Sequence, residues 1–153
     1  MNEYACRSMQ DVIDFAIKRE ENARDDYLQY RDKTNNKGLK DFFQELADEE
    51  EKHRQLLADR DVSHLGAFEP TQVENLKLSD FMVDVKFSPD MDYQEALTLA
   101  MKKEEKAHAF YAAWQNRCAD AETAKLFEFL AGEEMKHKRK LEDVFDQDIL
   151  MWN

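Results

Sequence analysis

The feature that most constrains the fold is an internal repeat: residues of the first half of the chain recur 84 positions later. The octapeptide at residues 46–53 reads LADEEEKH, and the one at residues 130–137 reads LAGEEMKH. The same offset, without a gap, relates the segment from Glu20 to Tyr27 to the segment from Glu104 to Tyr111. Two copies are too few for a solenoid. The repeat therefore predicts two related units that pack around a pseudo-twofold axis.

Each unit is predicted to be a helical hairpin. The 153 residues contain only 3 glycines and 2 prolines, whereas sheets and turn-rich folds use more of both. Helices are expected at about residues 8–34, 39–64, 92–118 and 120–145. Ser8, Asp92 and Asp120 are suited to begin three of them as N-caps, with Glu95 completing a capping-box pattern after Asp92. Gly38 is suited to a left-handed cap after the first helix.

Residues 65–91 connect the two hairpins and contain both prolines. Up-and-down bundles with short loops need no such connection, but a bundle whose second and third helices run parallel does. The sequence thus predicts an all-α, ferritin-like four-helix bundle as a single domain over residues 1–153, with hairpins at 8–64 and 92–147. Within the crossover, residues 76–87 (LKLSDFMVDVKF) are compatible with a short strand, a short helix or an extended strap.

Charge and composition exclude several classes of protein. The chain has 34 acidic and 22 basic residues, a formal charge of -12, which disfavours nucleic acid as a partner and favours multivalent cations. No apolar run approaches the ~20 residues that cross a bilayer, and the first residues do not resemble a signal peptide. Cys6 and Cys118 form no CxxC pair, so a reducing cytoplasm is the expected compartment.

Polar residues interrupt the apolar stripe of every predicted helix. In the first helix Ile13, Glu20 and Tyr27 recur every seven residues, which places Glu20 on the inward face. The equivalent positions of the other helices complete a set of six: Glu20, Glu50, His53, Glu104, Glu134 and His137. At a rise of ~1.5 Å per residue, each glutamate lies about 20 Å from the turn that joins the two helices of its hairpin. Four carboxylates and two imidazoles are therefore expected to meet at one level.

This convergence predicts a metal centre. Buried carboxylates repel one another and lose hydration, and two divalent cations would compensate four of them. One glutamate from each of two helices and a Glu-x-x-His motif from each of the other two is the ligand pattern of di-iron and di-manganese carboxylate proteins. We expect two iron ions, with manganese possible, because mixed oxygen and imidazole ligands suit these metals. The open coordination positions would take a small oxidant.

Other residues near the set have simpler interpretations. Five further glutamates are expected to form a solvated face: Glu21, Glu49, Glu51, Glu105 and Glu133. His108 completes a third Glu-x-x-His that the repeat does not preserve, so it is read as accidental, with a supporting role near Glu104 left open. Tyr27 and Tyr111 are expected to be core aromatics, or alternatively to donate hydrogen bonds to ligand carboxylates.

At these residues the chain resembles the rubrerythrins of the ferritin-like superfamily. The resemblance rests on residues 20–27 (EENARDDY), residues 46–53, Glu104 with Tyr111, and residues 134–137 (EMKH). It implies Glu20 and Glu104 as terminal ligands, Glu50 and Glu134 as bridging ligands, and one histidine per metal. It also implies peroxide reduction and a homodimer or larger assembly.

Two departures from the rubrerythrin pattern leave alternatives open. The 153 residues contain no paired CxxC motif of a rubredoxin domain, so electrons are expected from a separate, rubredoxin-like donor. Ala107 stands where typical rubrerythrins have an extra glutamate, which makes the site symmetric, as in bacterioferritin. A ferroxidase that uses O2 and handles iron is therefore the main alternative. A helical interaction bundle with a vestigial metal site is the second.

Overall fold

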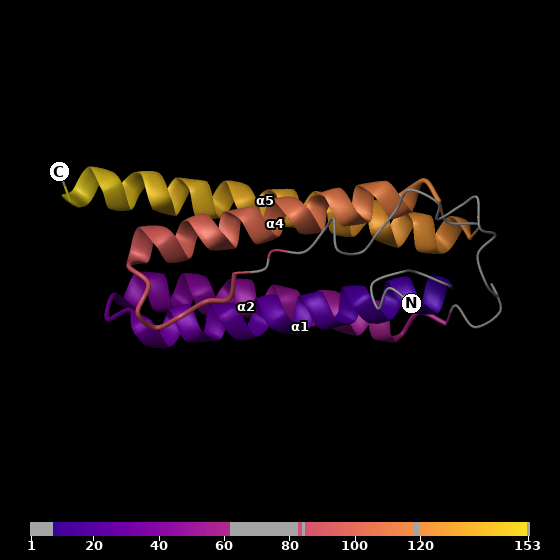
Figure 1. The fold of residues 1–153 in the computed structure, drawn as a ribbon, viewed down its shortest axis with the longest axis horizontal. Helices are drawn as coiled ribbons and strands as arrows, with labels where there is room; N and C mark the ends of the chain where they lie inside the picture. The colour runs from indigo at the N-terminus through magenta and orange to yellow at the C-terminus, as the bar shows by residue number, and fades with distance from the viewer. Residues whose placement is uncertain (1–7, 62–82, 84, 118–119, 153) are drawn as a thin grey trace.

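The computed structural model describes residues 8–61, 83, 85–117 and 120–152. Its helices are α1 (Met9–Lys33), α2 (Lys37–Ala58), α4 (Tyr93–Gln115) and α5 (Ala121–Trp152). Figure 1 shows two antiparallel hairpins, α1 with α2 and α4 with α5, stacked as two layers with their long axes nearly aligned. This is the predicted bundle of two helical hairpins, and it is all-α throughout the described ranges.

Side-chain caps fix where the helices begin. The predicted caps are present: Ser8 Oγ accepts from the Asp11 N–H, and Asp92 Oδ1 accepts from the Glu95 N–H at 2.8 Å. Asp120 accepts from the Glu122 N–H just before α5. Each of these bonds satisfies a backbone donor that the first turn of a helix leaves without a partner.

Two predictions at the ends of α2 differ from the structure. Gly38 does not form a left-handed cap; it lies in the first turn of α2, because Asn36 caps that helix by accepting from the Leu39 N–H at 3.1 Å. The helix α2 ends at Ala58 and not near His64, which lies outside the described residues. Arg60 follows this end and pairs with Asp120. The end of α2 therefore lies beside the start of α5.

The last helix is longer than predicted, and the third is shorter. The helix α5 continues past residue 145 to Trp152, and Val144 and Phe145 pack against the core. The helix α4 ends at Gln115. Most of residues 76–87 lies outside the described residues, and residues 85–87 have neither helix nor strand assigned. Phe87 rests edge-on against Tyr30, with 4.5 Å between ring centroids.

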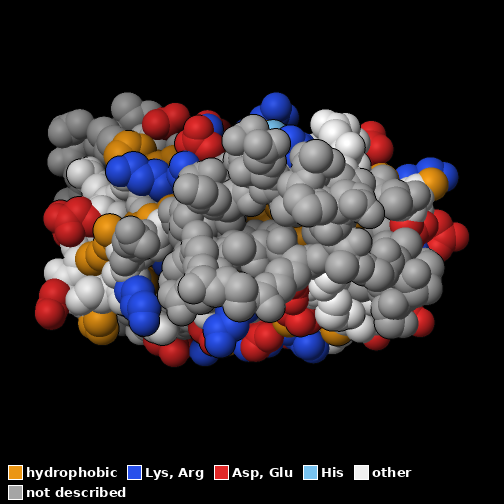
Figure 2. All heavy atoms as spheres, turned by 45° about the vertical axis from the view of Figure 1, so that its right-hand side comes forward, with side chains coloured by type: hydrophobic (Ala, Val, Ile, Leu, Met, Phe, Trp, Pro, Cys, Tyr) orange, Lys and Arg blue, Asp and Glu red, His pale blue; other side chains and the backbone are white. Residues whose placement is uncertain are grey.

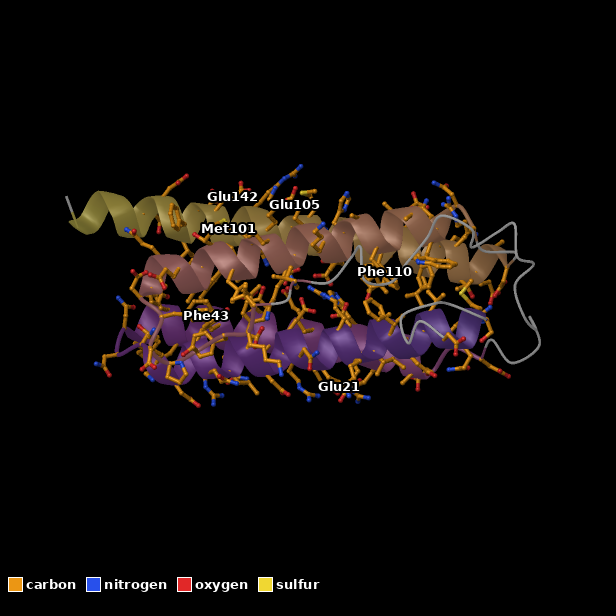
Figure 3. All side chains as sticks on the ribbon, in the orientation of Figure 1. Glu21, Phe43, Met101, Glu105, Phe110 and Glu142 are labelled. Atoms are coloured by element: carbon orange, nitrogen blue, oxygen red, sulfur yellow. The ribbon has the colours of Figure 1, made fainter. Side chains whose placement is uncertain are left out.

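Two apolar clusters fill the bundle, one on each side of its middle. One contains Ile13, Phe110 and Trp114, and the other contains Tyr30 and Phe43. Figure 3 shows Phe43 and Phe110 directed between the layers and well apart along the bundle axis. The heptad stripes predicted from the sequence make up most of both clusters. The polar residues of these stripes lie between the two clusters, in the middle of the bundle.

One face of the molecule is mixed in charge. Figure 2 shows acidic and basic side chains interspersed over the described part of one face. None of the four helices, over the described residues, has a stretch apolar and long enough to traverse a bilayer.

Candidate metal centre

The six residues predicted as metal ligands meet in the middle of the bundle. All are buried, with His53 the most exposed at 4%. Each helix contributes through its inward stripe, so the repeat supplies the same arrangement twice. We call Glu20, Glu50, Glu104 and Glu134 the glutamate cluster.

The six residues divide into two overlapping groups, each able to surround one cation. Ligand atoms within 4.8 Å of one another come from Glu20, Glu50, His53 and Glu134 in one group, and from Glu50, Glu104, Glu134 and His137 in the other. Glu50 and Glu134 belong to both groups, whereas Glu20 and Glu104 each belong to one. Shared and unshared carboxylates of this kind correspond to bridging and terminal ligands of a dinuclear site.

Two tyrosines tie the hairpins together at the cluster. Tyr27 on α1 donates to Glu104 Oε1 on α4 at 2.5 Å, and Tyr111 on α4 donates to Glu20 Oε1 on α1 at 2.6 Å. The two bonds are related by the sequence repeat. Burial and the nearby carboxylates raise the pKa of both phenols well above the ordinary value, so both remain donors. The tyrosines are thus core aromatics that also hold the two unshared glutamates.

The two histidines direct the same ring atom into the site. His137 Nδ1 lies 2.6 Å from Glu50 Oε1, and His53 Nδ1 lies 3.3 Å from Glu134 Oε1. The rings are stacked, with centroids 5.6 Å apart. Each Nδ1 is therefore the atom placed to bind a metal.

Glu49 corrects one expectation from the sequence. It was assigned to a solvated face, but its Oε2 lies 2.5 Å from His137 Nε2, and its side chain is only 27% exposed. The hydrogen bond with His137 lowers the pKa of Glu49 to about 2. Glu133, the repeat counterpart of Glu49, instead approaches Lys136 at 4.0 Å. Glu49 and Glu133 occupy the same position of the two octapeptides, so the sequence does not predict their different contacts. The packing of α2 against α5 produces the difference.

The other glutamates of the predicted solvated face lie outside the cluster. Glu105 is exposed, and Glu51 pairs with Arg24 and Arg54. Figure 3 shows Glu21 and Glu105 on outer faces of the two layers. His108 is half-buried and its Nδ1 lies 2.8 Å from the Ala131 carbonyl oxygen, so its visible role is to join α4 to α5.

Sequence reasoning missed Arg19. Its guanidinium lies among the carboxylates, with Nη1 3.1 Å from Glu20 Oε1 and 3.2 Å from Glu50 Oε2. It also reaches Glu134 and Glu104, at 3.3 and 3.4 Å. Arg19 precedes Glu20 on the helix, and a heptad pattern places it at the edge of the stripe. The length of its side chain, which the pattern does not describe, brings the charge inward.

Burial and charge divide the carboxylates into two pairs. Burial raises the pKa of Glu50 and Glu134 well above the usual carboxyl range, and the neighbouring glutamates add to this. Burial acts in the same direction on Glu20 and Glu104. There the charge of Arg19, with hydrogen bonds from neighbours, outweighs it and lowers the pKa. The pair with raised pKa values is the pair shared by both groups.

The donor set fits two metal ions. Half of the buried side-chain atoms that lack a hydrogen-bond partner among the described residues lie in the predicted ligand set: Glu20 Oε2, His53 Nδ1, Glu104 Oε2 and both side-chain oxygens of Glu134. Buried polar atoms are seldom left in this state, and metal coordination is one way to satisfy them. All five atoms belong to predicted ligands.

The comparison with protein families agrees with this geometry. The family model for rubrerythrin matches residues 11–145. The chain belongs to the rubrerythrin family. The match includes all six residues of the predicted ligand set.

Two solved structures have a similar fold. A hypothetical protein from Pyrococcus furiosus is 25% identical, with a TM-score of 0.67, and the match covers 95% of this chain and 92% of that one. A Thermotoga maritima protein described as a candidate ferritin-like diiron-carboxylate protein is 18% identical. Its TM-score is 0.70, with 92% of this chain and 96% of that one covered. No curated protein matches this rubrerythrin-family chain significantly.

Proposed function

We propose that this member of the rubrerythrin family is a di-iron oxidoreductase that reduces hydrogen peroxide with electrons from a separate donor. The observation that carries the proposal is the pair of overlapping ligand groups, each with three carboxylates and one imidazole, that share Glu50 and Glu134. Glu20 with His53 would complete one iron site, and Glu104 with His137 the other. Bound iron would supply two electrons and Lewis acidity to the oxygens of peroxide.

The protein residues would position and insulate this chemistry. Tyr27 and Tyr111 hold the unshared glutamates from opposite hairpins. Apolar clusters on both sides exclude water, which strengthens the electrostatic interactions inside the site. A donor protein resembling rubredoxin would deliver the electrons. A homodimer or larger assembly belongs to the same proposal.

Metal counting followed by rapid kinetics tests the proposal. The protein is loaded anaerobically with Fe(II), desalted and assayed for iron per chain, and we expect about two. The diferrous protein is then mixed with peroxide and, separately, with O2 in a stopped-flow instrument. Faster oxidation by peroxide than that of free Fe(II) supports the proposal. A rate equal to that of free Fe(II) contradicts it, and chains without bound iron contradict the metal site itself.

A ferroxidase is the second candidate function. It is favoured by the symmetry of the site, in which both histidine-bearing helices contribute Glu-x-x-His and Ala107 is buried where a further carboxylate would break the symmetry. In that case O2 would be the faster oxidant, and aerobic loading would leave iron in excess of two per chain. Sedimentation would then show an assembly large enough to hold it.

A further inference from the structure

Arg19 places a fixed positive charge at the centre of the glutamate cluster. Its Nη1 lies within 3.3 Å of Glu20, Glu50 and Glu134, and its Nη2 lies 3.4 Å from Glu104. The side chain is 15% exposed, so the guanidinium is largely removed from water while part of the side chain still reaches the surface. A single side chain thus contacts all four carboxylates of the proposed metal site.

Charge balance makes the guanidinium and a pair of metal ions alternatives. Two divalent cations already neutralise four ionised carboxylates, and an additional buried positive charge would lack a counter-charge. The distances lead to the same conclusion. Metal–carboxylate bonds are about 2.0–2.2 Å long, so ions bound by these oxygens would lie in the space that the guanidinium occupies.

The second hairpin has no equivalent of this contact. Lys103 is the counterpart of Arg19 in the sequence repeat, but Lys103 Nζ pairs with Asp26 Oδ2 at 2.9 Å. No ion pair among the described residues joins Lys103 to the glutamate cluster. Among the described residues the contact with all four carboxylates therefore belongs to Arg19 and not to its repeat counterpart, so this contact, like that of Glu49 with His137, departs from the symmetry of the repeat.

We propose that Arg19 is an internal counter-ion that competes with the metal ions for the glutamate cluster and so sets the metal affinity. The inference rests on the proposed dinuclear site. With both metals bound, the guanidinium moves out of the cluster toward solvent. Without metal, it stabilises the bundle by compensating buried carboxylates that would otherwise repel one another.

Arg19→Met tests the competition, because methionine keeps an unbranched apolar stem but lacks the guanidinium and its charge. The probe is Mn(II) alone, which is stable in air, and binding to the full chain is followed by calorimetry and by the electron paramagnetic resonance of free Mn(II). We expect Arg19→Met to bind Mn(II) about tenfold more tightly, within the usual range of coupling between two ligands. The metal-free variant should melt at a lower temperature than the metal-free wild type.

Lys103→Met is the matched control, because it removes a cation from the same position of the other repeat. Its Mn(II) affinity should remain near that of the wild type. Equal or weaker Mn(II) binding by Arg19→Met would overturn the competition. An equal gain in both variants would overturn it too, because general electrostatics would then account for the effect.

Arg19→Lys keeps the test valid if Arg19→Met does not fold without metal. Lysine retains the charge but loses the planar fork that reaches several carboxylates at once. Its Mn(II) affinity should exceed that of the wild type by a smaller factor, and an affinity equal to or below that of the wild type would refute the inference. Two Mn(II) per wild-type chain with no effect of either Arg19 variant would defeat this inference and leave the proposed function standing. Mn(II) binding by none of the chains would defeat both.

Discussion

At the scale of single residues, the centre depends on contacts that cross between the hairpins. Tyr27 and Glu104, like Tyr111 and Glu20, come from different hairpins and are joined by short buried hydrogen bonds. Hydrogen bonds to ionised groups contribute more to stability than those between neutral groups. The tyrosines therefore both position the proposed ligands and hold the two layers together.

Removing the hydroxyl group of either tyrosine should destabilise the bundle. We expect Tyr27→Phe and Tyr111→Phe each to lower the free energy of unfolding by about 1.5–3 kcal/mol, because a buried carboxylate loses its donor. Urea unfolding of the metal-free protein measures the change. Tyr30→Phe is the control, since the Tyr30 hydroxyl is buried without a hydrogen-bond partner among the described residues. A loss in Tyr30→Phe as large as in the other two would show that general packing is responsible.

Glu49 should matter for metal binding although it belongs to neither ligand group. Its carboxylate fixes the His137 ring through Nε2, which leaves Nδ1 directed into the site. Partners of this kind typically contribute about 10- to 100-fold in metal affinity. We expect Glu49→Ala to weaken Mn(II) binding by about that factor, as measured by calorimetry.

Glu133→Ala provides the comparison for this variant. Glu133 occupies the same position of the second octapeptide, but its recorded contact is with Lys136. Its loss should change Mn(II) affinity little. Similar effects in the two variants would indicate a non-specific effect of negative charge and would exclude a specific role for Glu49.

At the scale of elements, the register of each helix decides which residues reach the centre. The turn between α1 and α2 contains only residues 34–36. Asn36, the last residue of this turn, is the N-cap of α2. A short turn with a defined cap fixes the position of Glu50 relative to Glu20. The prediction that Gly38 would provide this stop was wrong because a side-chain cap requires no left-handed residue.

Loss of the Asn36 cap should lower the free energy of unfolding by a moderate, measurable amount. We expect Asn36→Ala to reduce the free energy of unfolding by about 1 kcal/mol, because the Leu39 N–H loses its acceptor. Urea unfolding with an unchanged m-value would measure it. Asn35→Ala changes an exposed neighbour and should have a much smaller effect. Equal effects of the two substitutions would mean that loop composition matters and the cap does not.

At the scale of the whole molecule, the centre has an electrostatic cost that metal binding would remove. The chain carries a formal charge of -12, and the glutamate cluster lies in its interior. Ligands that bind only the native state stabilise it by mass action. Stability of the fold and loading of the site should therefore be linked.

Metal should raise the melting temperature. At a concentration of Fe(II) about 100 times its dissociation constant, the gain would be about 2.7 kcal/mol, or roughly 5–10 °C for a domain of this size. Anaerobic thermal melts with and without Fe(II) measure the shift. The double variant His53→Ala/His137→Ala should lose most of it. Equal melting temperatures of the wild type with and without saturating Fe(II) would contradict the linkage.

The sequence by itself determined the duplicated hairpins, the burial of the six polar positions and their common level in the bundle. These properties follow from periodicity, because a repeated face at a constant offset from a turn has few arrangements open to it. Most of the predictions that failed concern helix ends. The end of α2 near Ala58 coincides with contacts of Arg60 to residues at the start of α5, and the sequence of α2 does not encode these contacts.

Only the tertiary structure decided the roles of Arg19 and Glu49. Both lie beside the inward stripe, where a sequence pattern assigns charged residues to solvent. In the folded chain Arg19 extends to four carboxylates contributed by all four helices, and Glu49 meets a histidine on α5. Their repeat counterparts, Lys103 and Glu133, make other contacts. The partner of a long charged side chain depends on which groups surround it in space. These groups come together only when the helices have packed.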